Sequence, residues 1–281
     1  MSSKRRHRKP TTKQLFSVTD DNAPFSYVEA YKMLCTNLEF ITAAQDCKKI
    51  MITSTLANEG KTNVSVNLAL TLAGYDKKVC LVECDLRRPS VHRFLKANRN
   101  SEGLTNVLKG EKTISEVIRN VEGTTMDILL SGSTPPNPSE LLSSAKMKNL
   151  IDELEKMYDY VIYDTPPVLL VTDAAALGKY MNGALLVVKH NATEKGLVLK
   201  AKGYLDSAGV KILGAIYSIY SEKSAGNYYY SRYSSYNYYY YYGGYYGYGY
   251  GYGHKHRKKS DDELPEEINN SDGENTDNGE E

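Results

Sequence analysis

The stretch STLANEGKT, residues 54–62, is the strongest indication of the fold predicted for this chain. It follows the apolar run KIMITS at residues 49–54, which predicts a buried strand, and precedes TNVSVNLALTLAGY at residues 62–75, which predicts a helix. A loop of this composition between a strand and a helix is typical of a phosphate-binding site, because backbone N–H groups and the helix N-terminus attract phosphate oxygens. The sequence therefore predicts a nucleotide-binding loop.

Two side chains at the end of this loop suit nucleotide chemistry. Lys61 is able to reach the β- and γ-phosphates, and the Thr62 hydroxyl is a candidate Mg²⁺ ligand. The full pattern has glycine five places before Gly60, where this chain has Thr55. The alternative is an ordinary strand-loop-helix turn in which Gly60 serves backbone geometry and Lys61 lies in solvent. We expect these residues to contact the nucleotide: Asn58, Glu59, Gly60, Lys61, Thr62, Asn63 and Arg87.

Apolar patterns along the rest of the chain predict alternating strands and helices. Helical spacing predicts an amphipathic helix over residues 26–41, and Pro138 suits the first position of a helix with Asn137 and Glu140 as its capping box. Further buried strands are expected at residues 78–83, 126–131, 160–164, 183–189 and 210–218. Apolar strands separated by helices predict an α/β fold with a predominantly parallel sheet covered by helices on both faces.

Two of the expected strands end in acidic residues. Glu83 and Asp85, followed by Arg87, lie at the end of one strand, and Asp164 ends another. Ligands of open parallel sheets bind beyond the carboxyl ends of the strands. We therefore expect these acids to converge with the nucleotide-binding loop, the alternative being exposed loop acids without a function.

The two ends of the chain differ in composition from the part between them. The start carries KRRHRK at residues 4–9, residues 227–253 are mostly tyrosine and glycine, residues 254–259 read HKHRKK, and every charged residue after Lys259 is acidic. We expect four regions: a basic arm at 1–25, a folded domain at 26–220, a disordered tyrosine-rich tail at 221–253 and a charged C-terminus at 254–281.

Apolar run lengths and cysteine spacing argue against several protein classes. The longest apolar runs, such as residues 184–188, are far shorter than the roughly 20 residues that a membrane-spanning helix needs. The start also lacks a signal-peptide segment, so we expect a cytoplasmic protein. Four cysteines, without zinc-site spacing, are expected to be structural: Cys35, Cys47, Cys80 and Cys84. No nucleic-acid partner is expected.

The chain resembles the bacterial tyrosine kinases of capsular and exopolysaccharide biosynthesis, a branch of the P-loop ATPases. The resemblance covers residues 27–220 and the tail, and it rests on STLANEGKT, LVECDLRRP, SGSTPPNPSELL and YDYVIYDTPPV in that order. It implies an autokinase that uses ATP and Mg²⁺ to phosphorylate the tail of a neighbouring subunit in a ring. It also implies control of polysaccharide export, a transmembrane co-polymerase that activates the kinase at the inner face of the membrane, and a cognate phosphatase.

The resemblance also implies roles for single residues. Four fall on catalytic positions: Lys61, Glu83, Asp85 and Asp164. Three fall on metal positions: Thr62, Asp85 and Asp164. Four occupy the positions of the subunit-assembly motif, in which Lys32 and Cys35 replace two arginines and so weaken the expectation of a ring: Glu29, Lys32, Cys35 and Thr36. The expected phosphate acceptors are Tyr228, Tyr229, Tyr230, Tyr233, Tyr236, Tyr238, Tyr239, Tyr240, Tyr241, Tyr242, Tyr245, Tyr246, Tyr248, Tyr250 and Tyr252.

Several residues depart from the family pattern. Glu83 replaces an aspartate, Ser218 replaces an asparagine near the base, and Ala57 and Asn58 replace a common Pro-Gly pair. These departures keep open a nucleotide-binding scaffold with weak or no kinase activity. A membrane-associated ATPase of the MinD type is a second alternative, although its signature lysine would fall at Leu56.

Overall fold

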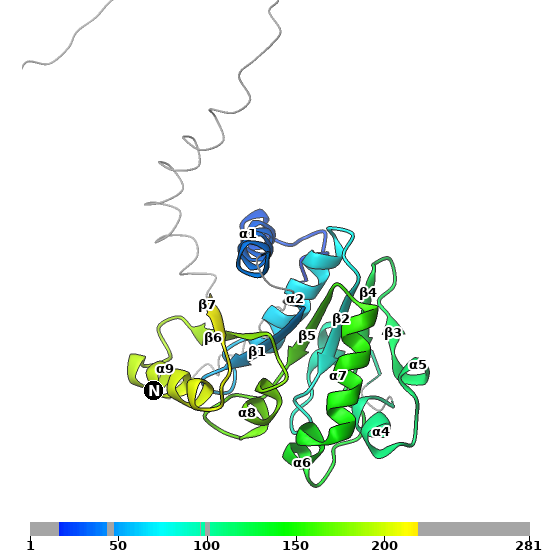
Figure 1. Ribbon diagram of the computed structural model, residues 1–281. Coiled ribbons are helices and arrows are strands. Elements are labelled where there is room, and N and C mark those ends of the chain that lie inside the picture. Colours follow the sequence, from blue (N-terminus) through cyan, green and yellow to red (C-terminus); the bar gives the residue numbers. More distant parts are fainter. Residues whose placement is uncertain (1–16, 44–47, 96, 99–101, 219–281) are drawn as a thin grey trace, which may run out of the picture. The chain divides into compact units, whose positions relative to one another are not determined.

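The protein is described by a computed structural model over residues 17–43, 48–95, 97–98 and 102–218 (Figure 1). The tyrosine-rich tail, the charged C-terminus, most of the basic start and Cys47 lie outside the described residues. No helix in the described part of the chain has both the length and the apolar composition needed to cross a bilayer.

The described residues form one seven-stranded sheet in the order β3-β4-β2-β5-β1-β6-β7. Its strands are β1 Lys49–Ser54, β2 Val79–Glu83, β3 Arg119–Asn120, β4 Met126–Leu129, β5 Tyr160–Asp164, β6 Gly183–Lys189 and β7 Ile212–Ser218. β3 runs antiparallel to β4, and all other pairs are parallel. The predicted parallel sheet is confirmed; the short edge strand β3 was not predicted, because two exposed residues carry no apolar pattern.

Helices occupy the connections between the strands. They are α1 Phe25–Thr42, α2 Lys61–Ala73, α3 Val91–Phe94, α4 Leu104–Lys109, α5 Ile114–Val117, α6 Pro138–Ser143, α7 Ala145–Met157, α8 Asp173–Gly178 and α9 Lys195–Ser207. α6 starts at Pro138 as predicted, but the capping box is wrong. The Asn137 side chain makes no cap hydrogen bond, and its amide instead donates to the Glu140 carboxylate at 2.5 Å.

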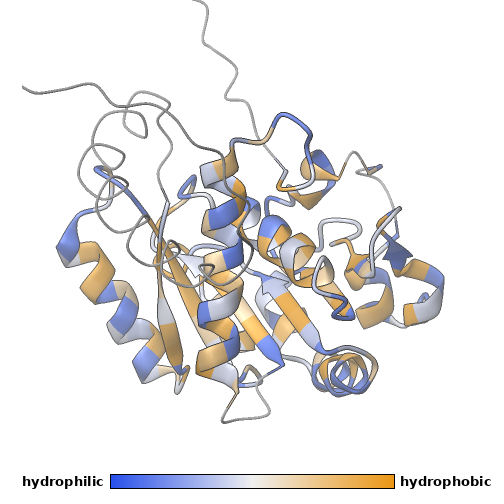
Figure 2. Cartoon of the chain, turned by 90° about the horizontal axis from the view of Figure 1, so that it is seen from above, coloured by the Kyte–Doolittle hydropathy of each residue, from blue (hydrophilic) through white to orange (hydrophobic). Residues whose placement is uncertain are grey.

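Both faces of the sheet are covered, as β1 shows most clearly. Ile50 and Ile52 pack in the cluster that contains the apolar residues of α1 and α2, whereas Met51, between them, packs with residues of α8 and α9. α7 covers the same face as α8 and α9, over β2 and β5 (Figure 1). Figure 2 shows hydrophobic residues along the strands and mixed residues on the surrounding helices. Burial on two faces explains why the strands are continuous apolar runs.

The segment before α1 belongs to the folded domain. Val18 packs against the core, and its N–H donates to the Asn67 side chain on α2 at 2.7 Å. The Tyr27 hydroxyl on α1 donates to Asn63 of α2 at 2.8 Å. The domain therefore takes in residues 17–25, which the sequence assigned to the basic arm.

Cys35 does not fit the subunit-assembly role expected for it. Its side chain is fully buried in the core beneath α1, and burial raises the pKa of its thiol to about 12. The other residues of that motif lie at the surface: Glu29 pairs with Lys32 at 2.8 Å, and the Thr36 hydroxyl donates to the Lys32 carbonyl. The expectation is wrong for Cys35, because the helix turns this position toward the protein interior.

Candidate active site

The carboxyl ends of three neighbouring strands bring the candidate residues together. β5 lies between β1 and β2, and Asp164 is in register with Ile52 of β1 and with Glu83 of β2. The loop after β1 leads into α2, and the loop after β2 contains Asp85. The predicted convergence of this loop with the strand-end acids is confirmed for Asp85 and Asp164, which both lie within ion-pair distance of Lys61.

The loop between β1 and α2 depends on two residues with left-handed backbone. Asn58 has a φ of 62° and Gly60 a φ of 95°. Asparagine is one of the few residues with a side chain that adopts this conformation readily, which explains how Asn58 is accommodated. Thr55 is not among the residues with positive φ, so the backbone does not require the glycine of the full pattern there.

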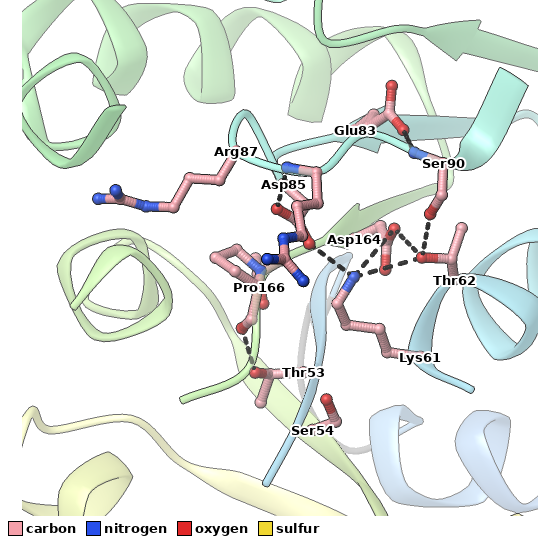
Figure 3. Close-up of polar contacts among 12 residues, drawn as sticks. Thr53, Ser54, Lys61, Thr62, Glu83, Asp85, Arg87, Ser90, Asp164 and Pro166 are labelled. Carbon is pink, nitrogen blue, oxygen red and sulfur yellow. Dashed lines mark hydrogen bonds and ion pairs between the residues drawn. The ribbon is translucent and has the colours of Figure 1, made fainter. Parts of the chain in front are cut away.

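The Lys61 ammonium lies between two buried carboxylates (Figure 3). Its Nζ is 2.8 Å from Asp85 Oδ2 and 4.0 Å from Asp164 Oδ2, and its side chain is 12% exposed. Burial opposes the charged ammonium, but Asp164 and Asp85 outweigh it and raise the pKa of Lys61 above its ordinary value. Lys61 is therefore a permanent positive charge at the first residue of α2.

Asp164 accepts hydrogen bonds from two hydroxyls of α2. Thr62 donates to Oδ2 at 2.7 Å and Ser65 to Oδ1 at 3.0 Å. Burial raises the pKa of Asp164 to about 6, against the opposing charge of Lys61 and the Thr62 hydrogen bond. Asp164 is thus charged at neutral pH and loses its charge as the pH falls through about 6.

Glu83 is held by the backbone. Its Oε1 accepts the N–H groups of Ser90 at 2.6 Å and Val91 at 2.7 Å, and its Oε2 accepts the Ser131 N–H at 3.1 Å. Figure 3 shows its carboxylate directed toward Ser90 rather than toward Lys61. This placement differs from the expected catalytic position, and it makes Glu83 a residue that positions the start of α3.

Arg87 and Asn63 also point away from the Lys61 cluster. Arg87 makes a bidentate pair with the buried Asp173 of α8, with Nε to Oδ2 at 2.8 Å and Nη2 to Oδ1 at 3.0 Å. Asn63 accepts hydrogen bonds from Tyr27 and Asn67 on the α1 side of α2. In this structure both residues serve to hold elements together instead of facing the expected phosphate site.

Glu59 and Asn58 have opposite placements in the loop. Asn58 is exposed, whereas Glu59 is 3% exposed and its carboxylate accepts the Leu56 N–H at 2.9 Å and the Thr193 hydroxyl. The Ser90 hydroxyl donates to Thr62 Oγ1 at 3.0 Å.

Sequence reasoning missed several partners of the site. They are Ser65, Ser90, Asp173 and Thr193. Ser65 follows Lys61 and Thr62 at helical spacing, so the pattern could have indicated it.

The residues present fit a magnesium-nucleotide complex. No group of three or more His, Cys, Asp or Glu residues in the described ranges is arranged to hold a metal ion by itself. Mg²⁺ is usually bound by one or two carboxylates together with substrate phosphates. Thr62 and Asp164, 2.7 Å apart beside the phosphate loop, offer that kind of incomplete ligand set.

Comparison with known proteins decides the family. Residues 47–193 match the family model described as an AAA domain. The tyrosine-protein kinase YwqD of Bacillus subtilis (strain 168) is 43% identical over 190 residues, which are 67% of this chain and 79% of that protein. This chain belongs to the bacterial tyrosine kinases. The predicted family, fold and enzyme class are confirmed, and nucleotide binding follows from the P-loop ATPase family.

Solved structures agree with this family. The kinase domain of the Escherichia coli tyrosine kinase ETK has a TM-score of 0.70 and 36% identity, covering 78% of this chain and 85% of that one. The septum-site-determining protein MinD of Pyrococcus horikoshii OT3, complexed with Mg-ADP, has a TM-score of 0.52 and 25% identity, covering 61% and 70%. The MinD alternative is therefore less well supported than the kinase.

Replacing Glu83 by glutamine is expected to destabilise this kinase by about 2 kcal/mol, because one of its oxygens becomes an NH₂ group that faces backbone donors. Urea unfolding measures the loss. Since Glu83 does not contact Lys61, the tyrosine phosphorylation rate of the folded variant is expected to stay within about tenfold of wild type. A phosphorylation loss as large as that of a Lys61 variant, without a stability change, would contradict the positioning role.

Proposed function

We propose that this kinase transfers the γ-phosphoryl group of ATP to tyrosines in the tail of a neighbouring copy of itself. The observation that carries the proposal is the meeting of Lys61, Asp85 and Asp164 at the phosphate loop. The expected acceptors, tyrosines within residues 228–252, belong to the same chain and lie outside the described residues. Tail phosphorylation would in turn regulate capsular or exopolysaccharide synthesis and export.

The three charged groups suit different parts of one reaction. In the transfer, the tyrosine oxygen forms a bond to the γ-phosphorus, the bond to the β-phosphate oxygen breaks, and ADP leaves. Lys61 would neutralise charge on the phosphates. Asp85 or Asp164 would accept the phenol proton: Asp85 accepts the Lys61 ammonium and the Arg88 N–H, and Asp164 accepts two hydroxyls of α2. Mg²⁺, when bound by Thr62 and Asp164, would supply further charge neutralisation.

Assembly into a ring is part of the proposal. Among the large apolar side chains that α1 exposes, Met33 at 67% and Phe40 at 76% lie on the same side as Glu29, Lys32 and Thr36. At helical spacing these residues share one side of α1, which supports a contact with another subunit. Each phosphate adds roughly −1.5 to −2 charge, so a phosphorylated tail would be repelled by the acidic C-terminus and released.

The family resemblance supports the partners. We propose a transmembrane polysaccharide co-polymerase that activates the kinase and recruits it to the inner face of the membrane, and a phosphatase that removes the tyrosine phosphates. These partners would make phosphorylation a cycle and not a single event.

Mixing two variants tests transfer between subunits. One, Lys61→Met, keeps every tail tyrosine; the other keeps Lys61 but has phenylalanine at all tyrosines of residues 228–252. With ATP, Mg²⁺ and the co-polymerase segment, the Lys61→Met chain is expected to gain mass in steps of about 80 Da, measured by intact-mass spectrometry.

Three results of that experiment separate the possibilities. Each variant alone is expected to gain no mass in the tail. Phosphate in wild type without any in the mixture would show transfer within one chain. If wild type also gains none while it binds nucleotide, the scaffold interpretation replaces the autokinase.

A further inference from the structure

Glu59 connects the phosphate loop to other parts of the protein through hydrogen bonds. It lies between Asn58 and Gly60, the two residues of the loop with left-handed backbone. Its side chain is turned into the protein, where Oε2 accepts the Leu56 N–H at 2.9 Å and Oε1 accepts the Thr193 hydroxyl. The buried Glu59 carboxylate thus accepts one hydrogen bond from within the loop and one from Thr193, which is distant in the sequence.

A second hydrogen bond from outside the loop holds the backbone of Glu59. The Ser218 hydroxyl donates to the Glu59 carbonyl oxygen at 2.6 Å. Thr193 lies in the connection from β6 to α9, and Ser218 is the last residue of β7. The two segments are joined to each other, since the His190 N–H donates to the Ser218 carbonyl at 2.9 Å. Two hydroxyls from adjacent strand ends therefore converge on Glu59.

A loop with left-handed residues keeps that conformation only when its surroundings hold it. Phosphate-binding loops depend on exact placement of backbone N–H groups, and displacements near 1 Å can cost about a hundredfold in rate. We propose that Thr193 and Ser218 are positioning residues of the nucleotide site, which act on the phosphate loop through Glu59. Neither makes a hydrogen bond to Lys61, Asp85 or Asp164 among the contacts of the described residues.

Ser218 also lies close to the tyrosine-rich tail in the sequence. The tyrosine-rich tail begins at residue 221, shortly after β7 ends, so the Ser218 hydrogen bond links the phosphate loop to the strand that precedes the tail. This inference goes beyond the proposed transfer between subunits, because it concerns nucleotide binding alone.

The test is nucleotide affinity in hydroxyl-deletion variants of the full chain. Thr193→Val keeps the side-chain shape and removes the donor, and titration calorimetry with Mg·ADP is expected to show about tenfold weaker binding. Ser218→Ala is expected to act in the same direction, and the double variant to lose less than the product of both effects, because both act through Glu59. Thr193→Ser, which restores a hydroxyl, is expected to restore the affinity.

Steady-state kinetics distinguish a role in positioning the phosphate loop from a general loss of structure. Because the loop holds the phosphates before and during transfer, the KM for ATP is expected to rise more than kcat falls. Thr71→Val is the matched control: its hydroxyl donates to a carbonyl within α2 at 2.7 Å, and its removal is expected to leave the affinity unchanged.

Two outcomes would overturn the proposal: folded Thr193→Val and Ser218→Ala proteins that both bind Mg·ADP within twofold of wild type, or a Thr71→Val loss as large as theirs. Because binding is measured without phosphorylation, weakened binding in a protein that never phosphorylates its tail would support this inference while refuting the autokinase.

Discussion

Lys61→Met is expected to lower the rate of tyrosine phosphorylation by about a hundred- to a thousandfold, the usual effect of removing one group that stabilises transition-state charge. Lys61 is the cation between Asp85 and Asp164, and methionine keeps its length without its charge. The variant also loses the positive charge that offsets two buried carboxylates, so its melting temperature is expected to fall. Intact-mass spectrometry over time measures the rate, and a thermal melt confirms that the variant is folded.

Lys49→Met is the matched control. Lys49 makes an ion pair with Glu155 at 2.6 Å and its side chain is 14% exposed, close to the 12% of Lys61. It lies at the opposite end of β1 from the phosphate loop. The control is expected to lose stability while phosphorylating normally. Equal rates for Lys61→Met and wild type would refute the role of Lys61, and equal losses in both variants would show that stability alone explains the effect.

Asp164→Asn is expected to lower phosphorylation at least about a hundredfold while making the nucleotide-free protein more stable at neutral pH. The amide keeps an oxygen for a hydroxyl of α2 but cannot provide the negative charge proposed for Mg²⁺ binding. Stability rises because the buried charge is removed. The two opposite changes distinguish a functional carboxylate from a structural one.

The stability that Asp164→Asn gains is expected to depend on pH, in a direction set by the pKa of Asp164. The pKa of Asp164 is raised from 3.8 in the unfolded chain to about 6 in the folded protein. Its contribution to stability is therefore fully present below about pH 4 and is lost as the pH rises through about 6. The advantage of the asparagine variant should be small at pH 4.5 and largest at pH 7.5, as measured by urea unfolding.

Asp127→Asn serves as the control for Asp164→Asn. Asp127 lies on β4 and accepts a hydrogen bond from the Tyr158 hydroxyl at 2.7 Å, away from Lys61. Its phosphorylation rate is expected to match wild type. If Asp164→Asn destabilised the protein at pH 7.5, burial of the Asp164 charge would not be the cost to stability that is inferred here.

Much of the fold could be read from the sequence, because its signals are local. β1, β5 and β6 begin and end at the predicted residues, since an apolar run bounded by polar residues marks a strand buried on both faces. The nucleotide loop and the two strand-end aspartates could be predicted for the same reason. β3 and the true contacts of Asn137 could not, because neither depends on a repeating pattern.

Local patterns in the sequence were enough to predict most strands, the phosphate loop and the closeness of Asp85 and Asp164 to it. Long-range packing was needed to show which polar groups surround Lys61 and which hold the framework: Glu83 accepts backbone N–H groups, Arg87 donates to Asp173, and Glu59 accepts the Thr193 hydroxyl. Periodicity and composition act over a few residues, whereas these partners lie up to 134 residues apart and meet only after the sheet has formed.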